Sequence, residues 1–254
     1  MLELYDHPLS PYGFKIRILL YEKGVEFEKH EIHTESQRAE LLDVNPRGEV
    51  PALRDGETVV ADSKVIGEYV EERHPVPPLL PTDLGARARA RRIELFADGP
   101  LDASTLMIAL FKVFRPGLAE THAAAVDAAA ALHRKRQEEL DRELEGREYF
   151  VDTFSRADVA VAPHVIMAAA IGHGVPPELA NLTAWLARMN QRPSVQRTTN
   201  EALAAFAAQQ EEKEPFFSND RLHWRSDRIE ALVKIGLGAW LLEDIEKGGA
   251  FLPD

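Results

Sequence analysis

A proline-rich segment divides the sequence into two parts with different patterns. Residues 74–83 read HPVPPLLPTD and hold four of the chain's 16 prolines. Proline removes a backbone donor and ends helices, so a segment of this kind is typical of a stiff connection between two folded parts. A chain of 254 residues is long enough for two domains, because one domain typically holds about 100–200 residues.

The part before this segment predicts a small domain of strands and helices. Apolar and polar residues alternate over 2–5 and 25–33, which indicates strands, and Asp55-Gly56 is a typical hairpin turn between two further short strands. The expected helices are 11–24, 36–43 and a segment that begins at Asp62 or Ser63. A right-handed crossover makes the first two strands parallel, and the hairpin adds an antiparallel pair.

The part after the proline-rich segment predicts a helical bundle. Alanine, leucine and charged residues recur at helical spacing in 86–113, 119–145, 156–171, 178–191 and 194–212. Another helix is expected from Trp224 to Leu242, within an extension that starts at about residue 213. We therefore predict an α+β protein with an N-terminal α/β domain at 1–78, a linker at 79–85 and an all-helical domain at 86–254.

Composition and charge exclude several classes of protein. The chain contains no cysteine, so it has no disulfide, no thiolate metal site and no cysteine nucleophile of its own. A net charge of −12 disfavours nucleic acid as a partner. No apolar run approaches the about 20 residues that cross a bilayer, and the first residues do not resemble a secretion signal. We expect a soluble, cytoplasmic protein with no membrane partner.

Three short motifs have the residue types that bind a ligand. Ser10 precedes a helix, where backbone N–H groups and the helix dipole stabilise an anion by about 0.3–1 kcal/mol. A cis bond between Val50 and Pro51 would turn Val50 toward an extended peptide, although the trans form is more common. Asp62 and Ser63 begin the next helix and could hold the ammonium and carboxylate of an amino acid. For Ser10 and for Asp62-Ser63, ordinary helix capping is the alternative.

The segment 155–158 has a structural interpretation, and the spacing of the histidines argues against a metal site. In Ser155-Arg156-Ala157-Asp158, a variant of the capping box, the Ser155 hydroxyl would reach the Asp158 N–H and the Asp158 carboxylate would reach back to Ser155. The nine histidines show no spacing typical of metal ligands, so no metal site is expected.

Taken together in their order along the chain, these motifs resemble the glutathione transferase superfamily over residues 2–200. The segments that carry the resemblance are SPYGFKIRILLYEKG, NPRGEVPAL, ADSKVIGEYVEERHP, YFVDTFSRADVAVAP and AWLARMNQRPSV. The resemblance implies a thioredoxin-like N-terminal domain, an all-helical C-terminal domain, a homodimer and glutathione as co-substrate. The stretches NPRGEVPAL and DSKVI are also similar to those of bacterial β-etherases, which cleave aryl ethers with glutathione.

The resemblance implies that Ser10 activates the glutathione sulfur. A thiol with a pKa of about 8.5 is mostly protonated at neutral pH, and a hydroxyl donor at a helix N-terminus favours the thiolate. Tyr5 and Tyr12 are the alternative donors. The thiolate would then attack a hydrophobic electrophile in a pocket beside it. The candidate lining residues of that pocket are Met107, Phe111, Phe114 and Trp224. Core packing is the alternative for each of the four.

The resemblance also implies the residues that bind glutathione. Pro51 matches the family's cis-proline, and Val50 matches the residue whose backbone pairs with the cysteinyl group. Asp62 and Ser63 match the acidic–serine pair that holds the γ-glutamyl end. Glu49 departs from the family pattern, in which Lys or Gln is often found there. This departure supports the alternative of a non-catalytic binding or regulatory protein.

Overall fold

The chain packs into two compact units, each assembled from three separate segments. The computed structural model describes residues 1–33, 35–211, 222–247 and 250–251. Unit 1 comprises Met1–Glu94, Arg147–Pro163 and Trp185–Glu212, and unit 2 comprises Leu95–Gly146, His164–Ala184 and Lys213–Asp254. The domain boundaries expected from the sequence follow the order of elements rather than these units, and they stay a prediction.

Unit 1 is built on a mixed β-sheet, which has four strands among the described residues, in the order β2-β1-β3-β4. Strand β1 (Leu2–Asp6) runs parallel to β2 (Phe27–Glu31) and antiparallel to β3 (Ala52–Asp55). Strand β3 pairs antiparallel with β4 (Thr58–Ala61) through the expected hairpin. The parallel pair, the hairpin and the predicted fold class are therefore confirmed.

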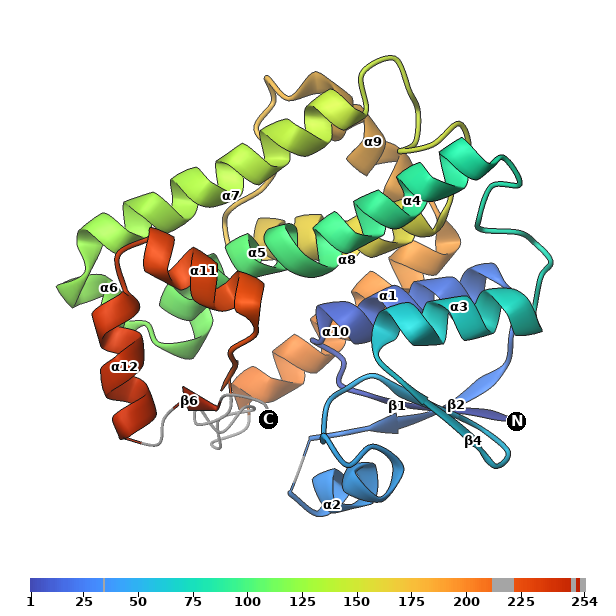
Figure 1. Ribbon diagram of the computed structural model, residues 1–254, viewed down its shortest axis with the longest axis horizontal. Coiled ribbons are helices and arrows are strands. Elements are labelled where there is room, and N and C mark those ends of the chain that lie inside the picture. The colour runs from blue at the N-terminus through green and yellow to red at the C-terminus, as the bar shows by residue number, and fades with distance from the viewer. Residues whose placement is uncertain (34, 212–221, 248–249, 252–254) are drawn as a thin grey trace. The chain divides into compact units, whose positions relative to one another are not determined.

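Helices cover both faces of this sheet (Figure 1). Helices α1 (Pro11–Glu22) and α3 (Ser63–Arg73) lie on one face and pack against one another, and α2 (Glu35–Val44) lies on the other. Helix α10 (Pro193–Glu211) also packs against α1. Every residue of α1 from Gly13 to Leu20 is buried, because the sheet, α3 and α10 surround it. Any charged group on α1 within this stretch must therefore find a partner inside the protein.

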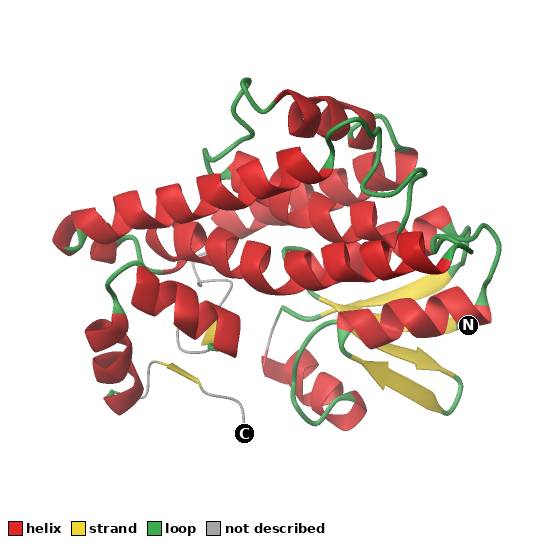
Figure 2. Ribbon diagram, turned by 45° about the horizontal axis from the view of Figure 1, so that its top comes forward, coloured by secondary structure: helices red, strands yellow, loops and turns green. Residues whose placement is uncertain are grey.

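The residues after 83 are mainly helical, as predicted (Figure 2). The helices are α4 (Leu84–Phe96), α5 (Asp102–Ala109), α6 (Gly117–Thr121), α7 (Ala123–Glu143), α8 (Arg156–Ala170), α9 (Ala180–Met189), α11 (Ser226–Lys234) and α12 (Gly238–Glu246), with π-helical turns η1 (Ala97–Leu101) and η2 (Leu110–Phe114). The expected helix over 86–113 is therefore continuous but irregular, and η1 contains Pro100. None of the described helices is long and apolar enough to cross a membrane.

The C-terminal part differs from the prediction in two respects. The single helix expected from Trp224 to Leu242 is instead the two helices α11 and α12, because Gly236 between them has a φ of +89°. A left-handed residue of this kind ends a helix, and glycine adopts it without steric cost. Strands β5 (Leu222–His223) and β6 (Ala250–Phe251) form a short parallel pair that was not expected. The predicted start of the extension, at about residue 213, lies outside the described residues.

Candidate functional site

The strand register brings the three candidate ligand-binding motifs to one edge of the sheet. Tyr5 of β1 pairs with Ala52 of β3, and Ala52 pairs with Ala61 of β4. Because adjacent strands in this row are antiparallel, the end of β1, the start of β3 and the end of β4 meet at the same edge. The candidate residues just beyond this edge are Ser10, Val50, Pro51, Asp62 and Ser63.

Ser10 is the N-cap of α1. Its backbone is extended (φ −73°, ψ 122°), and its buried Oγ accepts a hydrogen bond from Gly13 N–H at 3.2 Å. Pro11 occupies the first helical position, as expected. A serine hydroxyl that accepts one hydrogen bond still carries its own proton and can donate to another acceptor. Capping and donation to a ligand are therefore compatible roles for Ser10.

The two alternative tyrosines differ in position. Tyr5 Oη donates to Glu3 Oε2 at 3.1 Å, and its ring stacks on His30 with centroids 4.5 Å apart. That hydroxyl points back along β1, whereas Ser10 follows the other end of the strand. Burial and the hydrogen bond to Glu3 raise the pKa of Tyr5, which keeps the hydroxyl protonated. Tyr12 lies half-buried in the first turn of α1. The geometry therefore favours the hydroxyl of Ser10 over that of Tyr5 as the hydrogen-bond donor to a ligand sulfur, and Tyr12 stays an alternative.

A buried arginine holds the loop between β1 and α1. Arg17 Nη2 donates to Pro8 O at 2.7 Å, and Arg17 Nε lies 3.0 Å from Asp6 Oδ2. Arg17 Nη1 donates to Glu201 Oε2 of α10 at 3.1 Å. Burial raises the pKa of Asp6 to about 6, against the opposing effect of Arg17. Position 13 must be glycine, because a Cβ there would lie 1.5 Å from Asp6 Oδ1.

The Val50–Pro51 peptide bond is cis, as the resemblance implied. Val50 lies beyond the last register pair of the β1–β3 ladder, directly after a turn in which Asn45 Nδ2 donates to Glu49 O at 2.8 Å. The Glu49 carboxylate is paired, since Arg47 Nη2 lies 3.2 Å from Glu49 Oε2. This ion pair offsets the negative charge that distinguishes Glu49 from the family pattern.

Asp62 begins α3 in a strained backbone conformation. Its φ is +73° and its ψ is 122°, and among the described residues it is the one non-glycine residue with a positive φ. Such a conformation costs a side chain about 1–3 kcal/mol, and residues of this kind concentrate at functional sites. The exposed Asp62 carboxylate accepts from Lys64 N–H at 2.9 Å, whereas Ser63 is buried. Asp62 therefore caps α3, and its strain is an additional indication of a functional role.

The four candidate pocket residues lie together in unit 2. Met107, Phe111 and Trp224 are buried in one apolar cluster formed by α5, η2, α7, α11 and α12, and Phe114 packs against it. Trp224 also packs edge-on against Trp240, with ring centroids 6.3 Å apart. These four side chains are part of the core of the unit. Their role in lining a substrate pocket stays a prediction.

The capping box at the start of α8 forms with one change from the expectation. Asp158 Oδ2 accepts from Ser155 N–H at 2.9 Å and from Ser155 Oγ at 3.1 Å, while Ser155 Oγ accepts from Ala157 N–H rather than from Asp158 N–H. Asp158 Oδ1 accepts from Phe150 N–H at 3.2 Å and from Trp185 Nε1 at 2.8 Å. Burial raises the pKa of Asp158 to about 6, although these donors oppose the shift. The motif is structural, as predicted.

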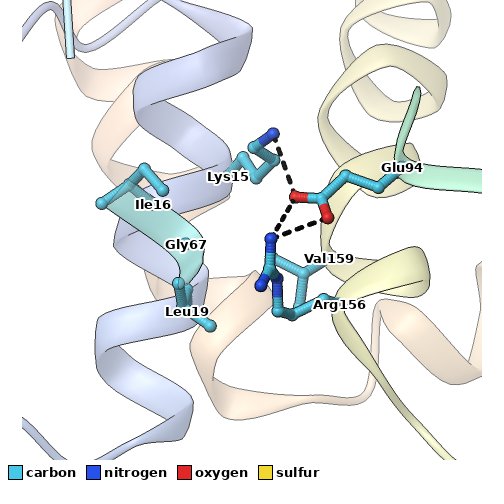
Figure 3. A pocket seen from close by; sticks show the side chains of 7 residues that line it. All are labelled: Lys15, Ile16, Leu19, Gly67, Glu94, Arg156 and Val159. Atoms are coloured by element: carbon cyan, nitrogen blue, oxygen red, sulfur yellow. Dashed lines mark hydrogen bonds and ion pairs between the residues drawn. The ribbon is translucent and has the colours of Figure 1, made fainter. Parts of the chain in front are cut away.

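Sequence reasoning missed a buried ionic cluster formed by Lys15 of α1, Glu94 of α4 and Arg156 of α8 (Figure 3). Arg156 Nη2 lies 2.7 Å from Glu94 Oε2, and Lys15 Nζ lies 3.4 Å from Glu94 Oε1. The other residues around them are Ile16, Leu19, Gly67 and Val159. The space between these side chains is too narrow for a ligand, so the charges are balanced within the protein. The two basic residues Lys15 and Arg17 within the otherwise apolar segment FKIRILL were the available signal.

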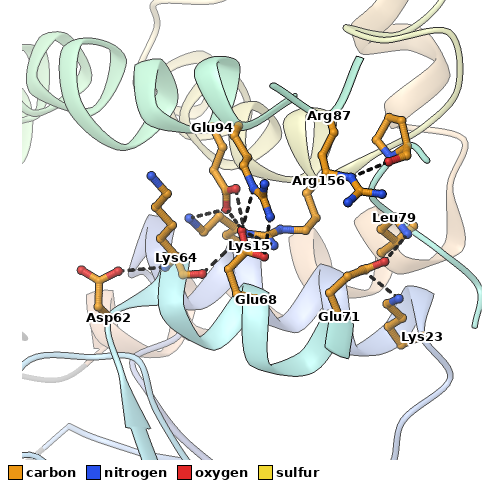
Figure 4. A network of polar contacts seen from close by, with 12 residues as sticks. Lys15, Lys23, Asp62, Lys64, Glu68, Glu71, Leu79, Arg87, Glu94 and Arg156 are labelled. Carbon is orange, nitrogen blue, oxygen red and sulfur yellow. Dashed lines mark hydrogen bonds and ion pairs between the residues drawn. The ribbon is translucent and has the colours of Figure 1, made fainter. Parts of the chain in front are cut away.

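Within unit 1, the proline-rich segment is held by a second set of partly buried contacts (Figure 4). Lys23 Nζ donates to Pro77 O at 2.6 Å and lies 2.8 Å from Glu71 Oε2. Glu71 Oε1 accepts from Leu79 N–H at 2.9 Å, and the Val76–Pro77 bond is cis. The connection is therefore held by Lys23, which directly follows α1, and by Glu71 of α3, and it is also stiffened by proline. Within the described ranges, no group of three or more histidine, aspartate or glutamate side chains is arranged to hold a metal ion.

Comparison with known proteins gives a consistent result. Residues 4–78 match the family model of the glutathione S-transferase N-terminal domain, and residues 101–193 match that of the C-terminal domain. The chain is 33% identical over 181 residues to the stringent starvation protein A homolog of Coxiella burnetii, a match that covers 71% of this chain and 82% of that protein. It is 31% identical over 215 residues to glutathione S-transferase 2 of Saccharomyces cerevisiae, with 76% and 88% covered. A solved glutathione S-transferase from Methylobacillus flagellatus, with glutathione bound, superposes with a TM-score of 0.68 at 28% identity, covering 78% of this chain and 98% of that chain.

Proposed function

Because the chain belongs to the glutathione S-transferase family, we propose that it is a glutathione transferase that activates the glutathione thiol for attack on a small hydrophobic electrophile. The observation that carries this proposal is the shared edge of the sheet, beyond which Ser10, Val50 and Asp62 lie. Glutathione bound to the Methylobacillus flagellatus relative supports the same ligand here. We further propose that the protein is a cytoplasmic homodimer.

Ser10 is the thiol-activating residue in this proposal. Glutathione supplies the sulfur nucleophile that a chain without cysteine lacks. Gly13 N–H orients the Ser10 hydroxyl, whose proton is available to a sulfur anion. The N-terminus of α1 adds the positive end of the helix dipole. A decrease of one to two units in the thiol pKa corresponds to about 1.4–2.8 kcal/mol, which a charge-assisted hydrogen bond and a helix terminus can supply.

Val50 and the start of α3 bind the cysteinyl backbone and the γ-glutamyl group of the tripeptide. The backbone of Val50 lies beyond the sheet ladder and pairs with the cysteinyl backbone. The exposed Asp62 carboxylate binds the γ-glutamyl ammonium, and the Ser63 hydroxyl with the first N–H groups of α3 binds the γ-glutamyl carboxylate. These donor and acceptor types fit both charges of an amino-acid head group. Arg47 reduces the repulsion that Glu49 would exert on the carboxylates of glutathione.

The hydrophobic electrophile is bound by the helical part of the chain. Met107, Phe111, Phe114 and Trp224 are the candidate lining residues, and substitution of Phe114, which lies at the edge of their cluster, should change KM for the electrophile more than KM for glutathione.

Two measurements on the purified chain test the proposed function. The first is retention on glutathione resin with elution by free glutathione, and the second is turnover of glutathione with 1-chloro-2,4-dinitrobenzene, a generic aryl halide. Retention together with turnover is the expected result. Failure of both would overturn the proposal.

The second candidate is a non-catalytic protein of the same fold that acts by binding. Similarity to a relative named for stringent starvation rather than for transferase chemistry favours it, as does Glu49. This candidate predicts no turnover and an unchanged thiol pKa for any glutathione that binds. Titration of the bound thiol by its thiolate absorbance therefore separates the two candidates.

A further inference from the structure

Both helices that carry the proposed glutathione-binding residues contact one group of charges, of which Lys15, Glu94 and Arg156 are buried and Glu68 is partly exposed. Helix α1 begins at Ser10, and α3 begins at Asp62. Four side chains join these two helices to α4 and α8, and we name them the Glu94 cluster: Lys15 of α1, Glu68 of α3, Glu94 of α4 and Arg156 of α8 (Figure 4).

Arg156 contacts α3 along one side of its first turns. Arg156 Nη1 lies 3.1 Å from Glu68 Oε1, and Arg156 Nη2 donates to Lys64 O at 3.5 Å. A Cβ at Gly67 would lie 2.9 Å from Arg156 Nη2, so the guanidinium lies directly against the helix there. Lys64 is also the residue whose N–H donates to the Asp62 carboxylate. One guanidinium therefore supports the turn that presents Asp62.

Glu94 connects this arginine to α1. Arg156 Nη2 donates to both Glu94 oxygens, at 3.0 and 2.7 Å, and Lys15 of α1 lies 3.4 Å from Oε1. Glu94 and Arg156 are 1% and 2% exposed. Removal of one partner from a buried ion pair leaves an uncompensated charge, so these side chains remain together in the folded protein. Because a guanidinium is a rigid planar fork, this pairing fixes a particular arrangement of the helices, which apolar packing alone specifies less closely.

We infer that Arg156 and Glu94 are positioning residues for the glutathione site, which set the first turn of α3 against α1 and so set the γ-glutamyl site relative to Ser10. This inference rests on the proposed function. It assigns to both residues an effect on one part of the ligand, the γ-glutamyl group, and not on the thiol-bearing part.

The test compares two ligands and a conservative variant of the full chain. Arg156→Lys keeps the positive charge but removes the planar fork whose Nη1 contacts Glu68 while Nη2 contacts Glu94. Glutathione is titrated by calorimetry, and Cys-Gly, which lacks the γ-glutamyl group, is titrated by NMR. The Kd of Cys-Gly divided by the Kd of glutathione measures the contribution of the γ-glutamyl group. We expect the variant to lower this ratio by about tenfold, with the Kd of Cys-Gly nearly unchanged, since the first turn of α3 no longer holds its charge-assisted contacts in place.

Arg91→Lys is the matched control. Arg91 lies on α4 and also contacts Glu68 at 3.1 Å, but its side chain is 46% exposed, so its replacement should leave both Kd values unchanged. Thermal unfolding checks that each variant is folded, and Glu94→Gln, which keeps the side-chain shape, is measured in the same way should Arg156→Lys not fold. An unchanged ratio would overturn the positioning role, whether both Kd values stay the same or both rise by the same factor. Absence of glutathione binding by the unsubstituted chain would instead overturn the proposed function.

Discussion

Replacement of Asp62 by glycine should stabilise the fold and weaken glutathione binding at the same time. Asp62 has a φ of +73° and a ψ of 122°, a conformation that costs about 1–3 kcal/mol for a residue with a side chain and little for glycine. The Asp62 side chain is exposed, and it caps α3 by accepting from Lys64 N–H at 2.9 Å. Exchange of an N-cap aspartate for glycine costs only about a few tenths of a kcal/mol.

The opposing contributions leave a measurable gain in stability. Glycine at position 62 increases the freedom of the unfolded chain, which costs about 0.4–1 kcal/mol. Relief of the backbone strain exceeds this cost and the loss of the cap, so Asp62→Gly should raise the free energy of unfolding by about 1 kcal/mol. The same change removes the charge-assisted hydrogen bond to the γ-glutamyl ammonium. A bond of this kind contributes about 1.5–3 kcal/mol, so Kd for glutathione should rise by about 10- to 150-fold.

Urea unfolding and calorimetry measure the two effects on the same samples. Asp62→Asn is the matched control, because it keeps the cap and the strain but loses the charge. It should weaken binding without stabilising the fold. Asp62→Ala keeps the strain and loses the cap, so it should destabilise the fold. A lower urea midpoint for Asp62→Gly than for the unsubstituted chain would refute the strain argument, and unchanged glutathione affinity would refute the binding role.

Three further predictions concern the other described features. Ser10→Ala should raise the pKa of the bound glutathione thiol by about one to two units with little loss of binding, as measured by thiolate absorbance against pH; an unchanged profile would transfer the role to a tyrosine. Asp158→Ala should lower the free energy of unfolding by about 3–5 kcal/mol, because it leaves three buried N–H donors without an acceptor. Urea unfolding monitored by tryptophan fluorescence measures this loss, and a loss below about 1 kcal/mol would contradict the structural role. Burial lowers the pKa of His133 to about 4, so the unfolded chain binds that proton first as the pH falls, and stability is lost between about pH 6.5 and 4. His133→Gln should remove about 2 kcal/mol from the difference in stability between pH 7 and pH 5, and an unchanged difference in urea unfolding would contradict it.

Local signals in the sequence account for most of the fold. The hairpin at Asp55-Gly56 was predictable, because that dipeptide favours the backbone of a tight turn wherever the surrounding chain lies. The break at Gly236 was not, because apolar periodicity continues on both sides and a single glycine within a helical pattern is a weak signal. The strand pair β5–β6 could not be predicted either, since each strand has two residues and depends on its distant partner.

The candidate site was predictable where its motifs are local and unpredictable where it depends on distant partners. Ser10 and Asp62 were found because each immediately precedes a helix. The cis bond between Val50 and Pro51 was predictable only from the family resemblance, because most bonds before proline are trans. Glu94 and Arg156 were missed because they are 62 residues apart in the chain, and each looks like an ordinary charged residue on a helix. A buried pair of this kind becomes visible only when the helices are packed.

The ion pair between Arg17 and Glu201 has a consequence for folding during translation. Arg17 leaves the ribosome 184 residues before its partner. At a synthesis rate of about 5–20 residues per second, this interval lasts roughly 10–40 s. During that time α10 is not available to cover α1, so the nascent sheet presents an apolar helix with an incompletely paired guanidinium. We therefore expect Arg17 and its neighbours on α1 to be among the last residues to reach their native environment, although they are among the first to be translated.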